Sequence, residues 1–395
     1  MSAIARITLR RIELKLRMVY VSSMYVMDSV RRTVIEIETE DGIVGIGETL
    51  GTDEVFALAG KLAAGMIGRS PLARLKLRNG FARSVFDNRN GRTGWSAFAG
   101  LDLACWDIAG KTHGMSLAEL LGGGGKRRIE VVCPLPALIV DRLVGRGELG
   151  AMFRDHRNID RLVAYALAQR RRHGFRCFKY KSAAADVEWD VAATRALREA
   201  LGRDAQLRFD PNAGYGPARA TALCARLEPL ALEFYEDPTD DIEGLAKLRA
   251  RMTRPVATNM CVIQLDHLAP AIRRGAIDVV LADIFMWGGV QNYREMAAVA
   301  ESCGLKVAVH SLFESGIGTA ANLHLASGLP QIARANDSGH HVIADDILSP
   351  SLPDVADGHL PLPIGAGLGI ALDPASLARL TVGEPVIVTA RRRPS

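Results

Sequence analysis

Six short apolar segments of this sequence each end in a side chain that could take part in catalysis. From the second lysine onward these side chains recur at steps of 29, 26, 23, 24 and 27 residues. A near-constant step of this size fits one strand and one helix, which would place them on the C-terminal rim of a barrel, where barrel enzymes keep their active sites. A single strand-end carboxylate often only caps the next helix. Six consecutive strand ends that each carry a lysine, acid, amide or histidine indicate a site. The side chains are Lys179 and Lys181, Asp210, Glu236, Asn259, Asp283 and His310.

Three of these residues predict a magnesium site. Asp210, Glu236 and Asn259 offer hard oxygen ligands from successive strands, which suits Mg²⁺ together with water and substrate oxygens. This predicted ligand set contains no thiolate or imidazole, so zinc is disfavoured. A divalent ion here could hold a substrate carboxylate and stabilise the negative charge left when the neighbouring proton departs.

The remaining residues predict an acid and a base on opposite sides of the substrate. Lys179 and Lys181 lie two apart on one strand and point to the same side. Two adjacent ammonium groups are expected to lower the pKa of at least one lysine and so make a neutral base feasible. Asp283 would orient His310 by a hydrogen bond. A base and an acid on opposite faces of one carbon permit elimination or racemisation.

The surrounding sequence predicts two domains. The chain has 395 residues, which fits a barrel with a smaller companion. Alternating segments at Ile7 to Leu16, Thr33 to Glu40 and Ile43 to Gly47 indicate an antiparallel meander, and helices at Leu58 to Met66 and Ala97 to Leu121 complete an α+β capping domain, residues 1–128. Residues 129–345 are expected to form a (β/α) barrel of the α/β class. The tail, 346–395, is expected to return to the cap, with 380–388 as an added strand.

The barrel prediction rests on short apolar strands that alternate with amphipathic helices. The stretch from Val140 to Arg161 breaks this pattern, and we interpret it as a long loop after the first barrel strand. The predicted strands are Phe175 to Tyr180, Leu207 to Asp210, Phe234 to Glu236, Val256 to Thr258, Val279 to Ala282 and Val307 to Val309.

Composition argues against several classes of function. The formal charge of +5 comes from basic and acidic residues spread along the whole chain, which is weak support for nucleic-acid binding. The six cysteines show no metal-binding or disulfide spacing. No apolar run is long enough to cross a bilayer, and residues 1–18 do not resemble a signal peptide. We therefore expect a cytoplasmic protein without nucleic-acid or membrane partners.

The motifs at these strand ends resemble those of the enolase superfamily, and within it those of the glucarate dehydratase group. Lys179-Tyr180-Lys181 is similar to the K-x-K motif, and Asp210-Pro211-Asn212 and Glu236-Asp237-Pro238 are similar to the first two metal strands. Ala257-Thr258-Asn259-Met260 is similar to the third-ligand strand of the glucarate dehydratase group, whose third ligand is Asn. Asp337-Ser338 resembles the eighth-strand Asp-Thr, although Gly339 follows instead of the usual histidine.

The resemblance implies a capping domain over a modified barrel and Mg²⁺ as cofactor. It also implies Asp283 and His310 as a dyad, Lys181 as the opposing base, and Lys179 as its electrostatic partner. The implied reaction removes the proton next to a carboxylate and then the β-hydroxyl through an enediolate, which gives a 2-keto-3-deoxy acid. The substrate would be an acid sugar and the protein a homo-oligomer. Candidate substrate contacts are Tyr25, Arg32, Asn212 and Asp337.

Substrate and reaction stay open at this stage. Asn259 leaves the metal only two protein anions while two lysines add positive charge, which favours a dicarboxylate such as an aldarate over a monocarboxylate. Arg31, Arg32 and Tyr25 could bind its distal carboxylate. A racemase or epimerase with the same two bases is the main alternative. A Schiff-base lyase would leave the three metal ligands unexplained, and a non-catalytic acid-binding barrel would not need bases on both faces.

Overall fold

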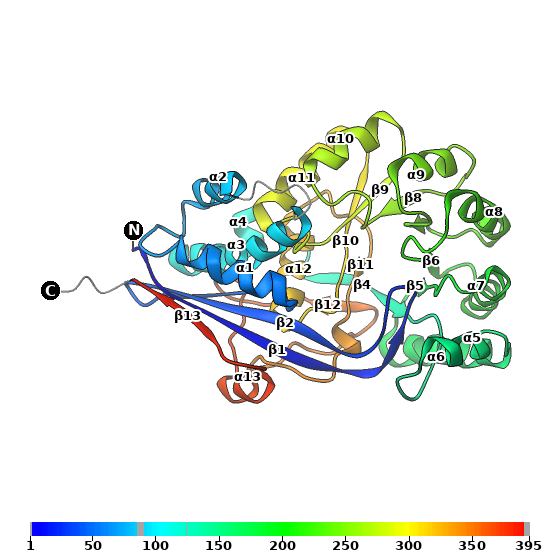
Figure 1. Ribbon diagram of the computed structural model, residues 1–395, viewed down its shortest axis with the longest axis horizontal. Coiled ribbons are helices and arrows are strands. Elements are labelled where there is room, and N and C mark those ends of the chain that lie inside the picture. The colour runs from blue at the N-terminus through cyan, green and yellow to red at the C-terminus, as the bar shows by residue number, and fades with distance from the viewer. Residues whose placement is uncertain (1, 85–90, 124, 391–395) are drawn as a thin grey trace.

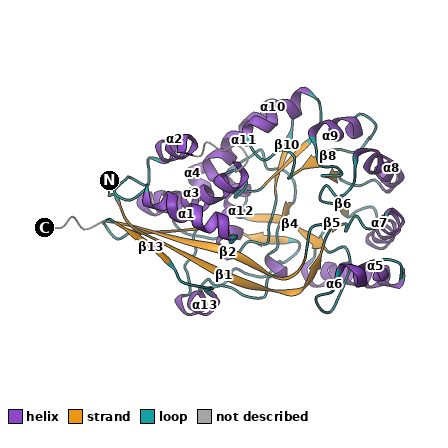
Figure 2. Ribbon diagram, viewed as in Figure 1, coloured by secondary structure: helices purple, strands orange, loops and turns teal. Residues whose placement is uncertain are grey.

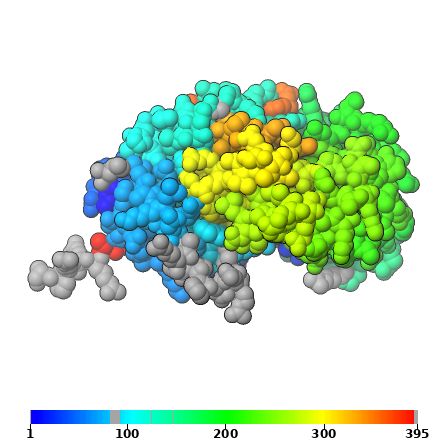
Figure 3. All heavy atoms as spheres, turned by 90° about the horizontal axis from the view of Figure 1, so that it is seen from above, coloured from blue at the N-terminus to red at the C-terminus, as the bar shows by residue number. Residues whose placement is uncertain are grey.

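The computed structural model describes residues 2–84, 91–123 and 125–390. An antiparallel sheet with its helices lies at one end of the molecule and a parallel barrel at the other, and the ribbon view shows both termini on the side of the antiparallel sheet (Figure 1). In the space-filling view the residues coloured blue cover one end and the green barrel residues the other (Figure 3). The two predicted kinds of structure are therefore both present.

The capping sheet forms because its strands alternate buried and exposed positions, as a sheet with one covered face requires. Its order is β13-β1-β2-β3, with all three pairings antiparallel. The predicted meander is confirmed, although its strands run several residues further than predicted. The strand at the chain's end pairs with β1, as predicted for the tail. The elements are β1 (Ile4–Val21), β2 (Val26–Thr39), β3 (Val44–Leu50), β13 (Val386–Thr389), α1 (Asp53–Ala64), α2 (Arg74–Ser84), α3 (Gly91–His113) and α4 (Leu117–Leu121).

Eight parallel strands form the barrel in the order β10-β9-β8-β7-β6-β5-β4-β11. All six predicted barrel strands are confirmed. The two ends of this series meet where Val307 bridges to Ile332 and where the Val309 amide donates to the Asn336 side chain at 3.0 Å. The strands are β4 (Arg128–Leu135), β5 (Cys177–Lys181), β6 (Gln206–Asp210), β7 (Tyr235–Glu236), β8 (Val256–Thr258), β9 (Val279–Ala282), β10 (Lys306–Val309) and β11 (Asn336–Asp337); β12 (His359–Pro361) pairs antiparallel with β4.

Helices cover the outside of the barrel (Figure 2). The stretch from Val140 to Arg161, predicted as a long loop, contains α5 and the first turns of α6, so that prediction was wrong. Its glycines and charges hid two short amphipathic segments that bury Leu149, Phe153 and Ile159. The helices are α5 (Arg146–Met152), α6 (Arg157–His173), α7 (Val187–Leu201), α8 (Pro217–Leu227), α9 (Ile242–Arg249), α10 (Leu265–Arg273), α11 (Val290–Ser302), α12 (Gly316–Gly328) and α13 (Pro374–Leu380).

The tip of the β1–β2 hairpin lies on the rim of the barrel, and the blue strands can be followed to this point in Figure 1. The Ser23 amide donates to the carbonyl of Ser182 at 3.0 Å, and the Ser23 hydroxyl donates to the carbonyl of Pro211 at 2.7 Å. The Ala137 amide donates to the carbonyl of Val21 at 2.8 Å. These bonds hold the cap against the ends of β4, β5 and β6.

Two helices of the barrel begin on carboxylates that belong to the cap. Glu48 of β3 is fully buried and accepts from the Ser315 amide at 2.9 Å, the Ser315 hydroxyl at 2.6 Å and the Gly318 amide at 2.7 Å, at the start of α12. Asp102 of α3 accepts from the Val290 amide at 2.8 Å at the start of α11. Carboxylates stabilise helix N-termini because the first amides lack partners within the helix.

Replacing Glu48 with glutamine is expected to lower the free energy of unfolding by about 1–3 kcal/mol, because an amide cannot accept from all three donors. Urea unfolding of the purified variant measures this change. The variant Glu54→Gln, at an exposed position of α1, serves as the control. Equal stability of the two variants would contradict the role assigned to Glu48.

The buried His324 of α12 makes stability depend on pH. Its Nδ1 accepts from the Ala118 amide at 3.3 Å and its Nε2 faces the carbonyl of Leu368 at 3.0 Å, which fits a neutral ring. Burial lowers the pKa of His324 to about 4. The unfolded chain takes up this proton first, near pH 6.5. The stabilisation present above pH 6.5 is therefore lost as the pH falls from 6.5 towards 4.

We expect His324 to remove about 1.4 kcal/mol of stability for each pH unit within that window. Urea unfolding at about pH 7 and about pH 5 would compare the chain with a His324→Gln variant. Glutamine keeps one hydrogen-bond donor and one acceptor but does not titrate. The variant should lose less stability on acidification. Parallel pH curves for the two proteins would rule out this contribution.

Along the described parts of the chain, no helix is both long enough and apolar enough to cross a membrane.

Candidate active site

The two lysines of β5 pair with carboxylates from three other strands, β6, β7 and β11. Lys179 Nζ lies 3.0 Å from Glu236 Oε1 and 3.8 Å from Asp210 Oδ2, and it also pairs with Asp337. Lys181 pairs with Asp210. All of these side chains are buried. The structure therefore brings the predicted lysines and two of the predicted metal ligands together at the carboxyl ends of the strands.

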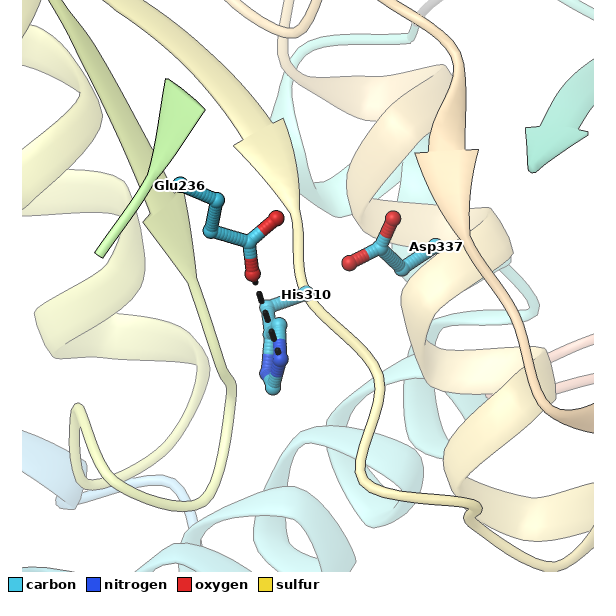
Figure 4. Close-up of side chains that lie close together, drawn as sticks. All are labelled: Glu236, His310 and Asp337. Atoms are coloured by element: carbon cyan, nitrogen blue, oxygen red, sulfur yellow. Dashed lines mark ion pairs between the residues drawn. The ribbon is translucent and has the colours of Figure 1, made fainter. Parts of the chain in front are cut away.

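Two overlapping sets of side chains could hold a cation here. Figure 4 shows Glu236, His310 and Asp337, with the carboxylate of Asp337 turned towards Glu236 and with an ion pair between His310 and Glu236. One ligand atom from each of these three lies within 4.8 Å of the others. The second set is the predicted one, Asp210, Glu236 and Asn259 from β6, β7 and the end of β8. Both sets contain Glu236, and lysines pair with carboxylates of both sets.

Unpartnered oxygens support the predicted set. Glu236 Oε2 and Asn259 Oδ1 are buried and have no hydrogen-bond partner among the described residues. Burial and the neighbouring Asp210 raise the pKa of Glu236 well above its usual range, because two buried carboxylates repel each other. A divalent cation would relieve this repulsion and satisfy both oxygens. The donor set therefore fits Mg²⁺, which takes hard oxygen ligands.

The lysines differ from the expectation that their mutual repulsion would lower a pKa. Burial alone would lower the pKa of Lys179, but Asp337 and Glu236 outweigh it and raise the pKa. The pKa of Lys181 is likewise raised, because Asp210 and Glu236 outweigh burial. Repulsion between the two ammonium groups is therefore smaller than their attraction to the carboxylates of other strands, whose proximity only the fold reveals.

His310 follows β10 and faces Asp283, which follows β9. The nearest oxygen, Asp283 Oδ2, lies 3.5 Å from His310 Nδ1, and neither atom has a hydrogen-bond partner among the described residues. The other carboxylate oxygen of Asp283 accepts from the amides of Phe285 at 2.8 Å and Met286 at 3.0 Å. Burial, with Lys179 and Lys181, lowers the pKa of His310 well below its usual value. The two predicted dyad residues are therefore adjacent.

Four of the predicted catalytic and metal-binding residues line a cavity of about 380 Å³ between the barrel and the cap. Lys179, Lys181, Asn259 and His310 lie on its barrel side. A volume of this size suits a small organic ligand. The strands β5 and β10 are five places apart in the sheet order, so Lys181 and His310 approach the cavity from different sides of the barrel.

The four candidate substrate contacts all line this cavity, but not all are free to bind. The guanidinium of Arg32 donates to the carbonyl of Phe313 at 3.1 Å and 3.3 Å and lies 3.4 Å from Glu48. Arg32 therefore holds the loop after His310. Asp337 is paired with Lys179 and with Arg208. Tyr25 and Asn212 are the members of this group without an ion pair.

Sequence reasoning missed Arg208, which pairs with Asp337 in the interior of the barrel. It is fully buried, and its Nε donates to Glu233 at 2.7 Å while its Nη1 lies 3.3 Å from Asp337 Oδ1. Arg208 therefore orients Asp337, which in turn holds Lys179. Arg208 precedes Asp210 by two residues on β6, so the alternation of side chains along a strand places both on the interior side. That signal was available in the sequence.

Comparison with known proteins identifies the family. Residues 161–376 match the family model described as "Enolase C-terminal domain-like". Residues 6–122 match the model "Mandelate racemase / muconate lactonizing enzyme, N-terminal domain". Together these models cover most of the barrel and most of the capping domain.

Curated relatives carry out several reactions. The chain is 33% identical over 371 residues to a probable glucarate dehydratase of Streptomyces coelicolor, covering 88% of this chain and 84% of that protein. It is 28% identical over 366 residues to a D-galactarolactone cycloisomerase of Agrobacterium fabrum, covering 89% and 92%. A racemase for N-succinyl-arginine and lysine from Bacillus cereus is 25% identical over 398 residues, covering 97% and 99%.

Solved structures of similar proteins share the whole fold. A Streptomyces coelicolor enolase described as a putative sugar isomerase superposes with a TM-score of 0.86 at 34% identity, covering 96% of this chain and 97% of that one. A Thermobispora bispora enolase complexed with magnesium and formate gives 0.86 at 29% identity, covering 96% and 92%. A Mycobacterium smegmatis enolase complexed with tartrate gives 0.87 at 29% identity, covering 96% and 91%. With both of its halves matched, this chain belongs to the enolase superfamily and is one of its enzymes.

Proposed function

We propose that this enzyme is a magnesium-dependent dehydratase of acid sugars. The observation that carries the proposal is the pair of buried, unpartnered oxygens of Glu236 and Asn259 beside Asp210; Asn259 also lines the cavity, together with Lys181 and His310. Similarity to the probable glucarate dehydratase supports dehydration, and similarity to the magnesium complex of the Thermobispora protein supports the metal.

The proposed ligands are Asp210, Glu236 and Asn259. When bound, Mg²⁺ would neutralise the two carboxylates and stabilise the negative charge that develops on a substrate carboxylate. Residues 1–128 and 346–395 are proposed as the cap, and residues 129–345 as the catalytic barrel. The hairpin tip at Ser23 would help to exclude water from the closed cavity.

Lys181 and His310 are the proposed acid and base. One takes the proton from the carbon next to the carboxylate, and the other donates a proton to the departing β-hydroxyl, which leaves as water. The resulting enol gains a proton at the β-carbon and becomes a 2-keto-3-deoxy acid. Lys179, fixed between Glu236 and Asp337, is proposed to supply positive charge near the substrate carboxylate.

A screen of mono- and dicarboxylic acid sugars with the purified protein and Mg²⁺ tests the proposal. Keto acid is measured as the semicarbazone, and exchange of the α-proton is measured by NMR in D₂O. Keto acid that disappears on chelation supports dehydration. Exchange or epimerisation without keto acid would instead support a racemase with the same residues, and the absence of both would contradict the proposed function.

Metal binding gives a separate prediction. Replacing Asn259 with leucine is expected to weaken Mg²⁺ binding roughly 10-fold or more, because one of three proposed protein ligands is lost, and even loss of a group that only hydrogen-bonds to a ligand reaches that size. Isothermal titration calorimetry measures the affinity. Asn158→Leu, on the outer helix α6, is the control. Unchanged affinity in Asn259→Leu would exclude Asn259 as a ligand.

A further inference from the structure

We propose that the end of the substrate remote from its reacting carboxylate is apolar. This inference rests on the proposed function, since it takes the carboxylate to lie beside Lys179 and Asn259. An apolar distal end differs from the dicarboxylate that the charge of the predicted ligand set favours. The substrate class is then narrower than acid sugars in general: a deoxygenated acid sugar with hydroxyls on its second and third carbons, whose chain beyond the third carbon carries no hydroxyl or charge.

The cavity wall between the catalytic side chains and the cap is built from thioether and aromatic groups. The wall is continuous with the catalytic residues, because both line the same cavity. Methionine side chains adapt their shape to an apolar ligand, and they offer it no strong hydrogen bond. The residues of this apolar wall are Tyr20, Met24, Met27, Met260, Met286 and Phe313.

The aromatic part of the apolar wall is fixed by its surroundings. The ring of Phe313 packs edge-on against that of Tyr20, with centroids 4.8 Å apart. Phe313 has a φ of 61°, in the left-handed region, and the two donors of Arg32 hold its carbonyl. A Cβ at Gly339 would lie 2.7 Å from Phe313 Cδ1, so only glycine leaves room for this ring. A wall held in this way is part of the native structure.

Two hydroxyls next to the apolar wall are engaged within the protein, whereas the Tyr20 hydroxyl in the wall is buried without a hydrogen-bond partner among the described residues and could serve one substrate hydroxyl. The hydroxyl of Ser29 donates to Glu13 at 2.7 Å, and that of Ser311 donates to Glu314 at 2.6 Å. Any further hydroxyl buried against the wall would give up its bonds to water without replacement. One such unmade hydrogen bond lowers affinity by roughly 10-fold. The wall therefore discriminates against a fully hydroxylated chain.

Two arginines at the cavity define the competing interpretation, a distal carboxylate. Arg31 lies 3.4 Å from Glu13 and its side chain is 56% exposed, so the ion pair is weak and screened by water. Arg92 is also exposed. Both cations line the cavity where solvent reaches it, as does Met24, which is 53% exposed, whereas Tyr20, Met286 and Phe313 are buried. The experiment below separates the two interpretations.

The test compares two acids of equal chain length and the same configuration at the second and third carbons. One continues as an alkyl chain, and the other is hydroxylated and ends in a carboxylate. We expect kcat/KM for keto-acid formation with Mg²⁺ to be at least about 10-fold higher for the alkyl acid. Met286→Gln and Met27→Gln should each reduce this ratio. Met252→Gln, a partly buried methionine outside the cavity, should leave the ratio unchanged.

The outcomes separate this inference from the proposed function. Turnover of the dicarboxylate in preference to the alkyl acid, lost in Arg92→Leu, would overturn the apolar inference and leave dehydration in place. A ratio that is unchanged in both Met286→Gln and Met27→Gln would also overturn it. Absence of α-proton exchange with either acid would instead contradict the proposed function itself.

Discussion

The variant His310→Asn is expected to lower kcat/KM for keto-acid formation by about 10³-fold, within the range for loss of a general acid or base. His310 faces Asp283 and lines the cavity with Lys181, so its loss removes the proton-transfer group on one side of the substrate. Steady-state kinetics and α-proton exchange in D₂O measure the effect. Asparagine keeps a polar side chain next to Asn259, which limits the structural disturbance.

His113→Asn is the matched control, because His113 is an exposed residue at the end of α3. It should retain full activity. Calorimetric titration of His310→Asn with Mg²⁺ separates loss of proton transfer from loss of metal, since His310 contacts the proposed ligand Asn259. If His310→Asn keeps more than a tenth of the activity, His310 is not the acid or base.

Replacing Arg208 with leucine should produce the largest loss of stability, about 3–5 kcal/mol. The guanidinium is fully buried between Glu233 and Asp337, donates to the carbonyl of Ala335 at 2.9 Å and lies over the ring of Phe234. Leucine would leave Asp337 with less compensation for its buried charge. Urea unfolding gives the change in free energy, and circular dichroism checks that the variant folds.

A surface ion pair provides the comparison for Arg208. Arg274 and Glu243 pair through side chains that are 44% and 58% exposed. Arg274→Leu should therefore cost no more than about 1 kcal/mol. Similar losses for the two arginine variants would show that the buried charge network does not stabilise the barrel. Arg208→Lys should recover part of the stability, because it keeps a cation near Asp337.

The barrel and its rim could be predicted because they leave a periodic signal. One βα unit follows another at a near-constant step, so Asp210, Glu236 and Asn259 had to emerge on neighbouring strands. The pairing of β13 with β1 was also predictable from an apolar segment at the end of the chain. Local pattern and sheet topology suffice for such features.

Contacts between distant segments leave no such signal. The role of Arg32 depends on the carbonyl of Phe313, 281 residues away, and on the unusual backbone of that residue. The raised pKa values of Lys179 and Lys181 depend on carboxylates from other strands. The apolar wall gathers residues from four regions of the chain, the β1–β2 hairpin and the segments at Met260, Met286 and Phe313, none of which is distinctive in its own segment. Such properties follow only from the folded arrangement.

The carboxylates of Glu48 and Asp102 also constrain how this protein can change by recombination. Each belongs to the cap but completes the first turn of a barrel helix, so a foreign cap without an acid at either place would leave amides unpaired at α12 or α11. A chimera therefore has to keep an acid at both places. The cap, which lines part of the cavity, and the barrel, which carries the proposed catalytic residues, must be matched at these two contacts.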